Sequence, residues 1–281
     1  MTGVIDAHHH YWKTAAQEQP WRQAAHVGLE RDFEPEHLDP LLSAAGVQGT
    51  VVMQSVDEPA ENDRLAAYAR HETVVGVVSW LPVQDPKAAL AELDRVAIPK
   101  HVGVRCLVAD DPMEWLGAPD VVALFQAIAD RGLAWDVVPI TAAQVLNVGR
   151  LAAAVPDLRV VVDHLGRPPI DTGGWEPWAG NMARLAELPN VFVKVSIGIN
   201  VLTAWDTWDA AAVEPFIVEV VRLFGANRLM LASNWPVVLL RTDYATAWTD
   251  LSAATLALLD SDEARDDLLG GTAARVYGIG S

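Results

Sequence analysis

Three consecutive histidines near the start of the chain are its most distinctive chemical feature. They occupy positions 8–10 in the segment IDAHHHYWK, residues 5–13. On a β-strand, side chains two residues apart point the same way, so His8 and His10 form a pair and His9 faces the other side. Paired imidazoles can bind a divalent cation or hydrogen-bond to a polarised carbonyl. Because the triplet is embedded between an apolar run and two aromatic residues, we interpret His8 and His10 as functional and His9 as structural, not as a tag remnant.

Other polar side chains lie in or just after apolar, β-branched runs further along the chain. They are Gln54, Arg105, Asp136, Asp163, His164, Lys194, Ser196 and Asn234. A guanidinium is a rigid fork of donors for a carboxylate or a hydroxyl, so Arg105 is a candidate substrate anchor; an ion pair with Asp136 is the alternative. Lys194 is costly to bury without a partner, and Asp136 could be a fixed partner for a base. His164 is either a structural histidine or a third imidazole of the same site.

The elements that must position these residues are eight short apolar runs with helix-like segments between them. Continuous apolar runs are typical of parallel strands that are covered on both faces. Helical signals are clear in residues 55–71 and 117–132. Eight such units predict an α/β protein, a (β/α)₈ TIM barrel forming a single domain over residues 1–281; a doubly wound open sheet is the alternative. The expected strands are residues 3–7, 49–55, 73–80, 101–106, 133–138, 158–164, 190–196 and 228–233.

The carboxyl ends of parallel barrel strands meet at one rim, where such proteins do their chemistry. We therefore expect the polar residues named above to converge there. The stretch 167–180 is rich in turn formers and follows the sixth strand, so it should overhang the same rim. The chain has 11 tryptophans, and those in predicted loops could stack on an apolar ring face of a carbohydrate-like ligand. Trp12 and Trp235 are the two that we place among the substrate contacts.

Composition excludes several classes of partner. The chain has 20 Lys and Arg against 37 Asp and Glu, a net charge of −17, which argues against nucleic acid as a partner. We expect no disulfide with one cysteine, no signal peptide and no membrane span. The prediction is a cytoplasmic protein that binds a small molecule, and a homo-oligomer is possible.

Several segments resemble the amidohydrolase superfamily, in its branch of sugar-acid lactonases. They are IDAHHHYW, GVR, VVDHLGRPPI, VKVS, RLMLASNWPV and GTAARVYGI, in the expected order from residue 4 to about residue 279. The branch includes lactonases of L-fucono-, L-rhamnono- and 2-pyrone-4,6-dicarboxylate lactones. The resemblance implies a TIM barrel that opens a lactone ring by adding water to its carbonyl. It also implies catalytic roles for His8, His10 and His164, and a substrate contact for Arg105.

One residue departs from the family pattern. Asn234 stands where the resemblance implies an aspartate that activates the water, and an amide cannot accept a proton at neutral pH. Either Asn234 inactivates the site while leaving binding intact, or another residue such as His164 or Asp163 is the base, or the reaction is not hydrolysis. We assign Gln54, Arg105, Asp136, Lys194, Trp12 and Trp235 to substrate binding.

The metal requirement stays open at this point. Family members bind one or two divalent ions, but the strand-8 acid and a strand-5 histidine are missing here, which argues against a binuclear site. We expect no essential metal, with one zinc held by His8 and His10 as the alternative. A metal-dependent decarboxylase on the same fold and a non-catalytic ligand-binding relative are the other functions that we consider.

Overall fold

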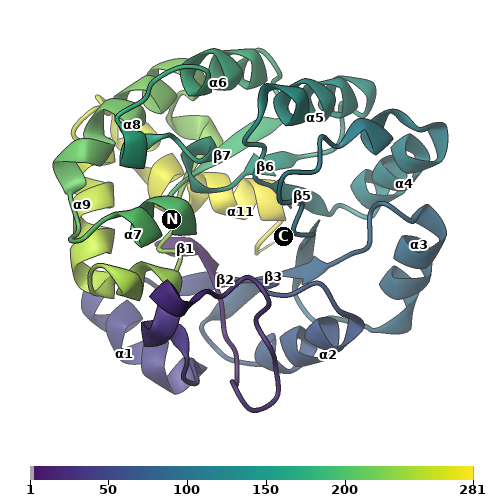
Figure 1. The fold of residues 1–281 in the computed structure, drawn as a ribbon, viewed down its shortest axis with the longest axis horizontal. Coiled ribbons are helices and arrows are strands. Elements are labelled where there is room, and N and C mark those ends of the chain that lie inside the picture. Colours follow the sequence, from purple (N-terminus) through teal and green to yellow (C-terminus); the bar gives the residue numbers. More distant parts are fainter. Residues whose placement is uncertain (1–2, 281) are drawn as a thin grey trace.

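The strands form a closed parallel barrel in the computed structural model, which describes residues 3–280 (Figure 1). Their order is β1 to β8, each paired in parallel with the next. The backbone closes the ring, because Asn234 N donates to His8 O (2.9 Å) and His10 N donates to Trp235 O (2.8 Å). The predicted (β/α)₈ barrel is therefore confirmed. The strands are β1 (Ile5–His9), β2 (Gly49–Met53), β3 (Val74–Trp80), β4 (His101–Arg105), β5 (Ala134–Val137), β6 (Val160–Val162), β7 (Val191–Val195) and β8 (Leu229–Leu231).

The helices begin where the sequence provides helix-start signals. Proline occupies the first turn of α1 to α4, where its missing N–H costs nothing. The residues that precede α3, α5 and α8 cap these helices. The side chains of Asp85, Thr141 and Asp209 accept hydrogen bonds from backbone amides in the first turn of each helix. No helix of residues 3–280 is long and apolar enough to cross a membrane. The helices are α1 (Pro35–Ala45), α2 (Pro59–Tyr68), α3 (Pro86–Arg95), α4 (Pro119–Asp130), α5 (Ala142–Ala154), α6 (Trp178–Ala186), α7 (Ile199–Ala204), α8 (Ala210–Phe224), α9 (Tyr244–Leu256), α10 (Asp262–Asp266) and α11 (Thr272–Tyr277).

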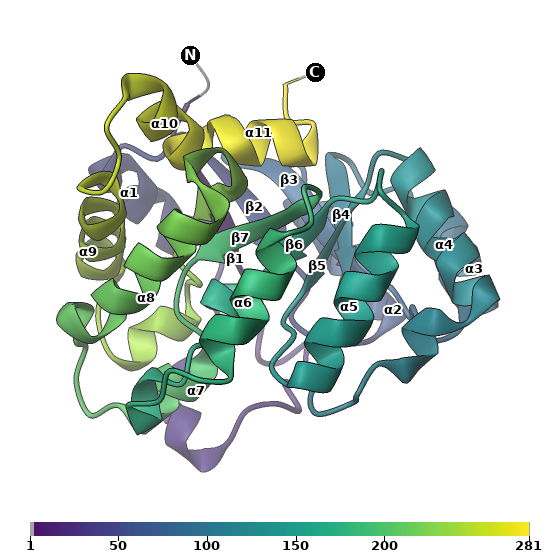
Figure 2. The same cartoon turned by 90° about the horizontal axis from the view of Figure 1, so that it is seen from above.

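Two apolar layers lie on opposite faces of the strands. A large outer layer packs the strands against the surrounding helices, and a smaller inner layer fills the barrel with residues such as Val51, Met53 and Val161. In Figure 2, α10 and α11 lie at one end of the barrel. Tyr277 of α11 belongs to the inner layer. This end of the barrel is therefore plugged, and the opposite end, where the strands finish, is left for the site.

His101, at the start of β4, makes the free energy of unfolding depend on pH, and one substitution can isolate its contribution. Its ring Nε2 lies 2.9 Å from Ser79 Oγ, and burial lowers its pKa to about 4. An unfolded histidine has a pKa of about 6.5, so between these values only the unfolded state binds the proton. Stability is therefore lost as the pH falls through this window, by about 1.4 kcal/mol per pH unit for this group.

A His101→Gln variant cannot titrate there. We expect its free energy of unfolding, measured by urea titration at pH 7 and pH 5, to fall less over that interval than the wild type's, by about 2 kcal/mol. The comparison cancels the contributions of all other titrating groups. Equal falls in the two proteins would contradict the prediction.

Candidate active site

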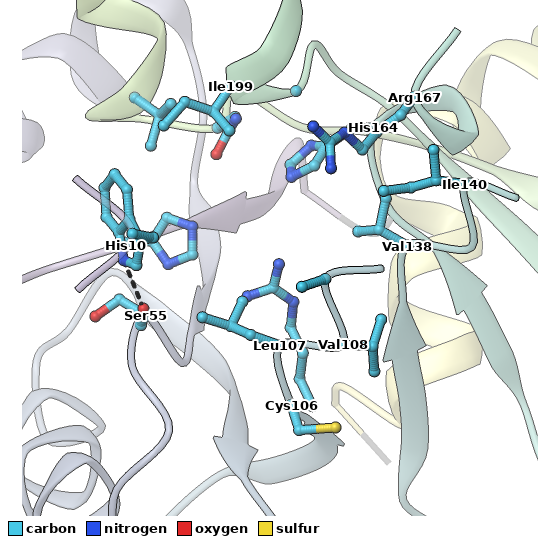
Figure 3. A pocket seen from close by; sticks show the side chains of 16 residues that line it. His10, Ser55, Cys106, Leu107, Val108, Val138, Ile140, His164, Arg167 and Ile199 are labelled. Atoms are coloured by element: carbon cyan, nitrogen blue, oxygen red, sulfur yellow. Dashed lines mark hydrogen bonds between the residues drawn. The ribbon is translucent and has the colours of Figure 1, made fainter. Parts of the chain in front are cut away.

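A pocket of about 270 Å³ opens at the carboxyl ends of the strands (Figure 3). Its polar lining includes His10 after β1, Arg105 at the end of β4, His164 after β6 and Asn234 after β8. These residues are 59 or more positions apart in the chain, and only closure of the barrel brings them to one cavity. The pocket is thus the place at which the chain concentrates hydrogen-bonding groups able to bind a carbonyl and a water.

His8 and His10 lie side by side, with His8 deeper in the barrel. Their Nε2 atoms are 3.1 Å apart, and His10 Nδ1 lies 3.1 Å from the carbonyl oxygen of Met53. A carbonyl only accepts, so His10 Nδ1 carries a proton. Burial lowers the pKa of both rings well below the ordinary value, so both are neutral. His9 packs instead on the ring of Tyr11, away from this pair.

Arg105 is held rigidly at the floor of the pocket. Its Nε donates to Asp163 Oδ2 (3.1 Å), and its Nη1 donates to Gln54 Oε1 (2.8 Å) and to the Gln54 backbone oxygen (3.1 Å). Gln54 is fully buried and does not line the pocket, so its role here is to orient the guanidinium. The Arg105–Asp136 pair that we considered from the sequence does not form, because Asp163 is the carboxylate within reach.

Beneath the pocket, Lys194 joins two carboxylates in the barrel interior. Its Nζ lies 2.5 Å from Asp136 Oδ1, 3.1 Å from Asp163 Oδ1 and 3.3 Å from His8 Nδ1. Tyr277 also donates to Asp136 Oδ1, at 2.7 Å. Lys194 and both carboxylates are fully buried and do not line the pocket. With Arg105 they form a balanced set of two cations and two anions, so the structure places Lys194 and Asp136 as supports for the site and not as surfaces that touch a ligand in this pocket.

Removing the Lys194 ammonium should strongly destabilise the fold. Lys194→Met leaves Asp136 buried with Tyr277 as its partner and with no cation, and breaking a buried pair in this way costs about 3–5 kcal/mol. We expect the loss in urea unfolding at pH 7. The control is Lys194→Met combined with Asp136→Asn, which removes the surplus charge and should recover more than half of the loss. A double variant as unstable as the single one would mean that lost packing, not charge, sets the cost.

His164 presents a neutral imidazole to the pocket. Burial is the main reason that its pKa is lowered to about 3. Its Nδ1 lies 2.8 Å from Ser196 Oγ, so Nε2 is the nitrogen left for a ligand or a water. Asp163, the neighbouring candidate base, does not line the pocket, and its oxygens are already bound by Arg105, Lys194 and His8. Burial opposes its ionisation, but Lys194 and Arg105 outweigh that and hold the pKa of Asp163 well below its ordinary range.

Asn234 lines the pocket, and its amide oxygen is free. Its Nδ2 donates to the Ile197 backbone oxygen at 2.8 Å, and its buried Oδ1 has no hydrogen-bond partner. The residue is 2% exposed and has a φ of 55°, a left-handed conformation that Asn and Asp tolerate better than most residues. A buried oxygen without a partner at a pocket wall is a place where a water, a ligand hydroxyl or a cation would bind.

The tryptophans assigned to substrate contact lie elsewhere. Trp12 is fully buried against Phe33, and its Nε1 donates to the Arg31 backbone oxygen. Trp235 is 1% exposed and packs on the same Phe33 ring. Both belong to an aromatic cluster that fills the space between β1, β8 and α1, because large apolar rings at a strand end are as useful for core packing as for binding. Trp21 is the tryptophan that lines the pocket.

The predicted overhanging stretch 167–180 contributes less to the pocket than expected. Arg167 lines the pocket, whereas Trp175 and Trp178 pack against Phe216 of α8. Sequence reasoning gave Arg167 no role, although a cation in a Gly- and Pro-rich turn after a strand was a usable signal. Tyr277 was also missed, and no local signal could have shown that a C-terminal helix reaches the barrel interior.

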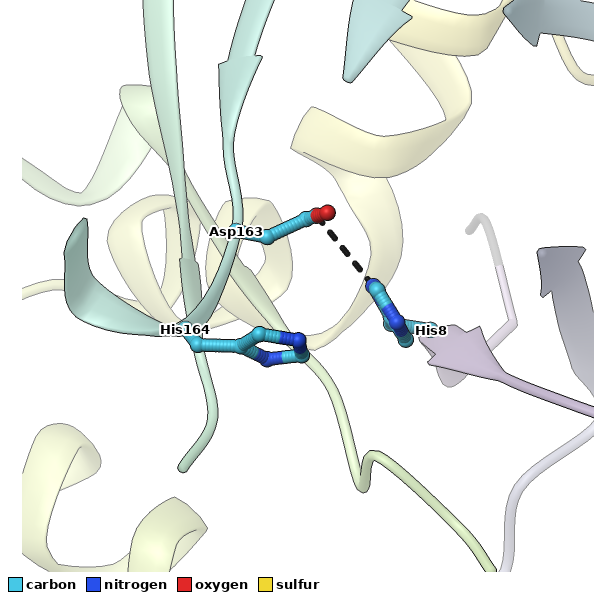
Figure 4. A group of neighbouring side chains, drawn as sticks. All are labelled: His8, Asp163 and His164. Atoms are coloured by element: carbon cyan, nitrogen blue, oxygen red, sulfur yellow. Dashed lines mark hydrogen bonds and ion pairs between the residues drawn. The ribbon is translucent and has the colours of Figure 1, made fainter. Parts of the chain in front are cut away.

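The donor atoms present fit a divalent cation. His8, Asp163 and His164 place potential ligand atoms within 4.8 Å of one another (Figure 4). Asp163 is already bound by two cations, so it serves better as the hydrogen-bond partner of His8 Nδ1 (3.2 Å) than as a ligand. The facing Nε2 atoms of His8 and His10, neutral as metal binding requires, and the unpartnered Asn234 Oδ1 complete a suitable donor set.

Comparison with known proteins places the chain in a family. The model of the amidohydrolase family matches residues 5–279. The chain belongs to the amidohydrolase family. The resemblance noted in the sequence is thereby confirmed. An L-fucono-1,5-lactonase of Burkholderia ambifaria is 35% identical to this amidohydrolase, with 99% of this chain and 97% of the relative covered.

Solved structures agree with this assignment. An amidohydrolase from Burkholderia multivorans, solved with bound zinc, has a TM-score of 0.88 at 27% identity and covers 98% of this chain and 99% of that one. A 2,6-dihydroxybenzoate decarboxylase from Rhizobium has a TM-score of 0.68 at 16% identity, with 99% of each chain covered. At that identity the likeness shows the shared barrel and carries no information on the reaction.

Proposed function

We propose that this amidohydrolase hydrolyses a small lactone. The observation that carries the proposal is the convergence of His10, Arg105, His164 and the free oxygen of Asn234 on one pocket. The names of its lactonase relatives support the same chemistry and make sugar-acid lactones the first class to test.

The residues divide the reaction between them. Arg105, fixed at Nε and Nη1, has Nη2 left to donate to the lactone carbonyl, and His10 lies at the same pocket. Asn234 Oδ1 accepts a hydrogen bond from the attacking water and orients it, but cannot take its proton. His164 Nε2 accepts that proton as the water oxygen bonds to the carbonyl carbon. The ring C–O bond then breaks, the leaving alkoxide takes the proton back, and a hydroxy acid is released.

A metal would add to this arrangement without replacing it. His8 and His10, with Asn234 Oδ1, are the residues that would hold a divalent ion, and such an ion would supply Lewis-acid polarisation of a carbonyl while His164 Nε2 stays free as the base. Without the ion, the same two rings form a hydrogen-bonded chain in which His8 Nε2 donates to His10 Nε2 and Lys194 donates to His8 Nδ1. In either state Met53 O keeps the orientation of His10.

A panel of γ- and δ-lactones tests the proposal. We expect acid release, followed by a pH indicator, at a rate above that of an equal concentration of a His164→Gln and Arg105→Gln double variant. The assay should be run with purified protein before and after treatment with a chelator, and again with added zinc. Failure of the wild type to open any lactone, together with failure of an Asn234→Asp variant, would overturn the proposed function.

A further inference from the structure

The pocket has few side-chain acceptors for the hydroxyl groups of a ligand. No Asp or Glu is among its lining residues within the described part of the chain. Ser55 Oγ is already saturated, because it donates to Glu61 (2.9 Å) and accepts from Gln17 (2.8 Å) and Gln19 (3.2 Å). Apart from the imidazoles, Asn234 Oδ1 is the acceptor that remains free, and the reaction proposed above uses it.

Aliphatic side chains form much of the remaining wall. Leu107 and Val108 follow β4, and Val138 and Ile140 follow β5; in Figure 3 the first two lie at the bottom of the pocket and the other two at its right. Ile199 of α7 lies across from them in this view. A wall of this kind stabilises an apolar ring edge or an alkyl group by burial and offers nothing to a hydroxyl.

Arg167 supplies an unpaired cation to the same pocket. Its Nε donates to Asn200 Oδ1 (3.0 Å), which fixes the plane of the guanidinium. No carboxylate of residues 3–280 lies within ion-pairing distance of it, although the other cation of the lining, Arg105, has Asp163. Figure 3 shows Arg167 next to His164, and both lie close to Gly198, where an added Cβ would be 3.4 Å from Arg167 Cγ and 3.6 Å from His164 Cβ.

We propose that the ligand of this pocket is a lactone that carries a carboxylate, bound by Arg167, and an otherwise apolar edge, packed on the wall of Leu107, Val108, Val138 and Ile140. The inference rests on the proposed lactone hydrolysis and narrows its substrate class. A fixed guanidinium with free terminal nitrogens matches the two oxygens of a carboxylate. A polyhydroxylated lactone would bury donors that find no acceptor here, and each such group weakens binding.

Binding of unreactive probes tests the two halves of the proposal separately. Cyclohexanecarboxylate has the ring and the charge, cyclohexanecarboxamide lacks the charge, and quinate adds four hydroxyls to the same ring acid. We expect cyclohexanecarboxylate to bind at least about tenfold more tightly than either of the others, by calorimetric titration at low salt. A preference for quinate would overturn the apolar half, and equal binding of acid and amide would overturn the carboxylate half.

Variants assign the preference to the residues named. Arg167→Gln should bring the acid-to-amide ratio of affinities to about one, and Arg167→Lys should retain part of it. Arg222→Gln is the matched control, because Arg222 pairs with Glu219 on the exposed face of α8. Val138→Thr adds a hydroxyl at constant volume and should shift the ratio toward quinate. An unchanged ratio in Arg167→Gln, in a variant whose thermal unfolding is like the wild type's, would remove Arg167 from the site.

Hydrolysis rates separate this inference from the function on which it rests. 5-Oxotetrahydrofuran-2-carboxylate should have a kcat/KM at least about tenfold above that of its 2-hydroxymethyl analogue and of a hexono-1,4-lactone. Faster opening of the hexonolactone would overturn the substrate class and leave lactone hydrolysis standing. If none is opened, even by Asn234→Asp, the proposed function fails, and the two binding ratios, acid to amide and acid to quinate, still decide what the pocket selects.

Discussion

Replacing Asn234 by Asp is expected to raise kcat/KM for lactone hydrolysis by about 10²- to 10⁴-fold, the usual contribution of a positioned general base. The amide oxygen of this pocket-lining residue has no partner, so a carboxylate of the same shape could bind the attacking water and take its proton. The left-handed φ of 55° suits Asp as it suits Asn. The second carboxylate oxygen would face the Ile197 carbonyl, which now accepts from Asn234 Nδ2; that contact disfavours the charged form and raises the pKa of the new acid.

Steady-state hydrolysis of the best lactone of the panel measures this effect. Asn234→Ala is the control, because it removes the orienting oxygen without adding a base, and it should be slower than the wild type. An Asp variant no faster than the Ala variant would show that the proton leaves the water toward another residue. The comparison also separates two of the three explanations of Asn234 drawn from the sequence. A large gain means that an aspartate is a stronger base than the residue that now takes the proton, and no gain means that the present base already serves as well.

His164→Gln is expected to lower kcat of the wild-type chain by about 10²-fold or more, with a smaller change in KM. His164 is the neutral base that lines the pocket, and its Nδ1 contact with Ser196 leaves Nε2 for the water. Glutamine preserves a polar side chain that can still reach Ser196 but accepts no proton at neutral pH. Because burial lowers the pKa of His164 to about 3, the wild-type rate should not fall through pH 6.5 as it would for an ordinary histidine.

Two further variants make the assignment specific. Ser196→Ala removes the group that holds Nδ1 and should cost about tenfold in kcat, less than loss of the ring itself. In the Asn234→Asp background, His164→Gln should cost less than in the wild type, because the carboxylate then takes the proton. If His164→Gln in the otherwise wild-type chain retains a third or more of the wild-type kcat, His164 is not the base.

The path of the chain could be predicted from local patterns because each pattern reports a local preference. Apolar β-branched runs predicted all eight strands, and Pro119 with Gly132 marked the ends of α4. The relation among the three histidines followed from the two-residue period of a strand: the Nε2 atoms of His8 and His10 meet, and His9 packs on Tyr11. The family could also be recognised, because its motifs are short and lie at the strand ends.

Which partner each charged residue takes was decided by tertiary structure alone. Arg105 could have paired with Asp136 by spacing, but barrel closure puts Asp163 within 3.1 Å of it and leaves Asp136 to Lys194 and Tyr277. The tertiary structure also decided the role of the tryptophans. Trp12 and Trp235 have large apolar rings, and the fold buries both in its core. The sequence by itself determined the barrel and the set of reactive groups at its rim. The tertiary structure decided which of them face the pocket, because that depends on distances between strands that are remote in sequence.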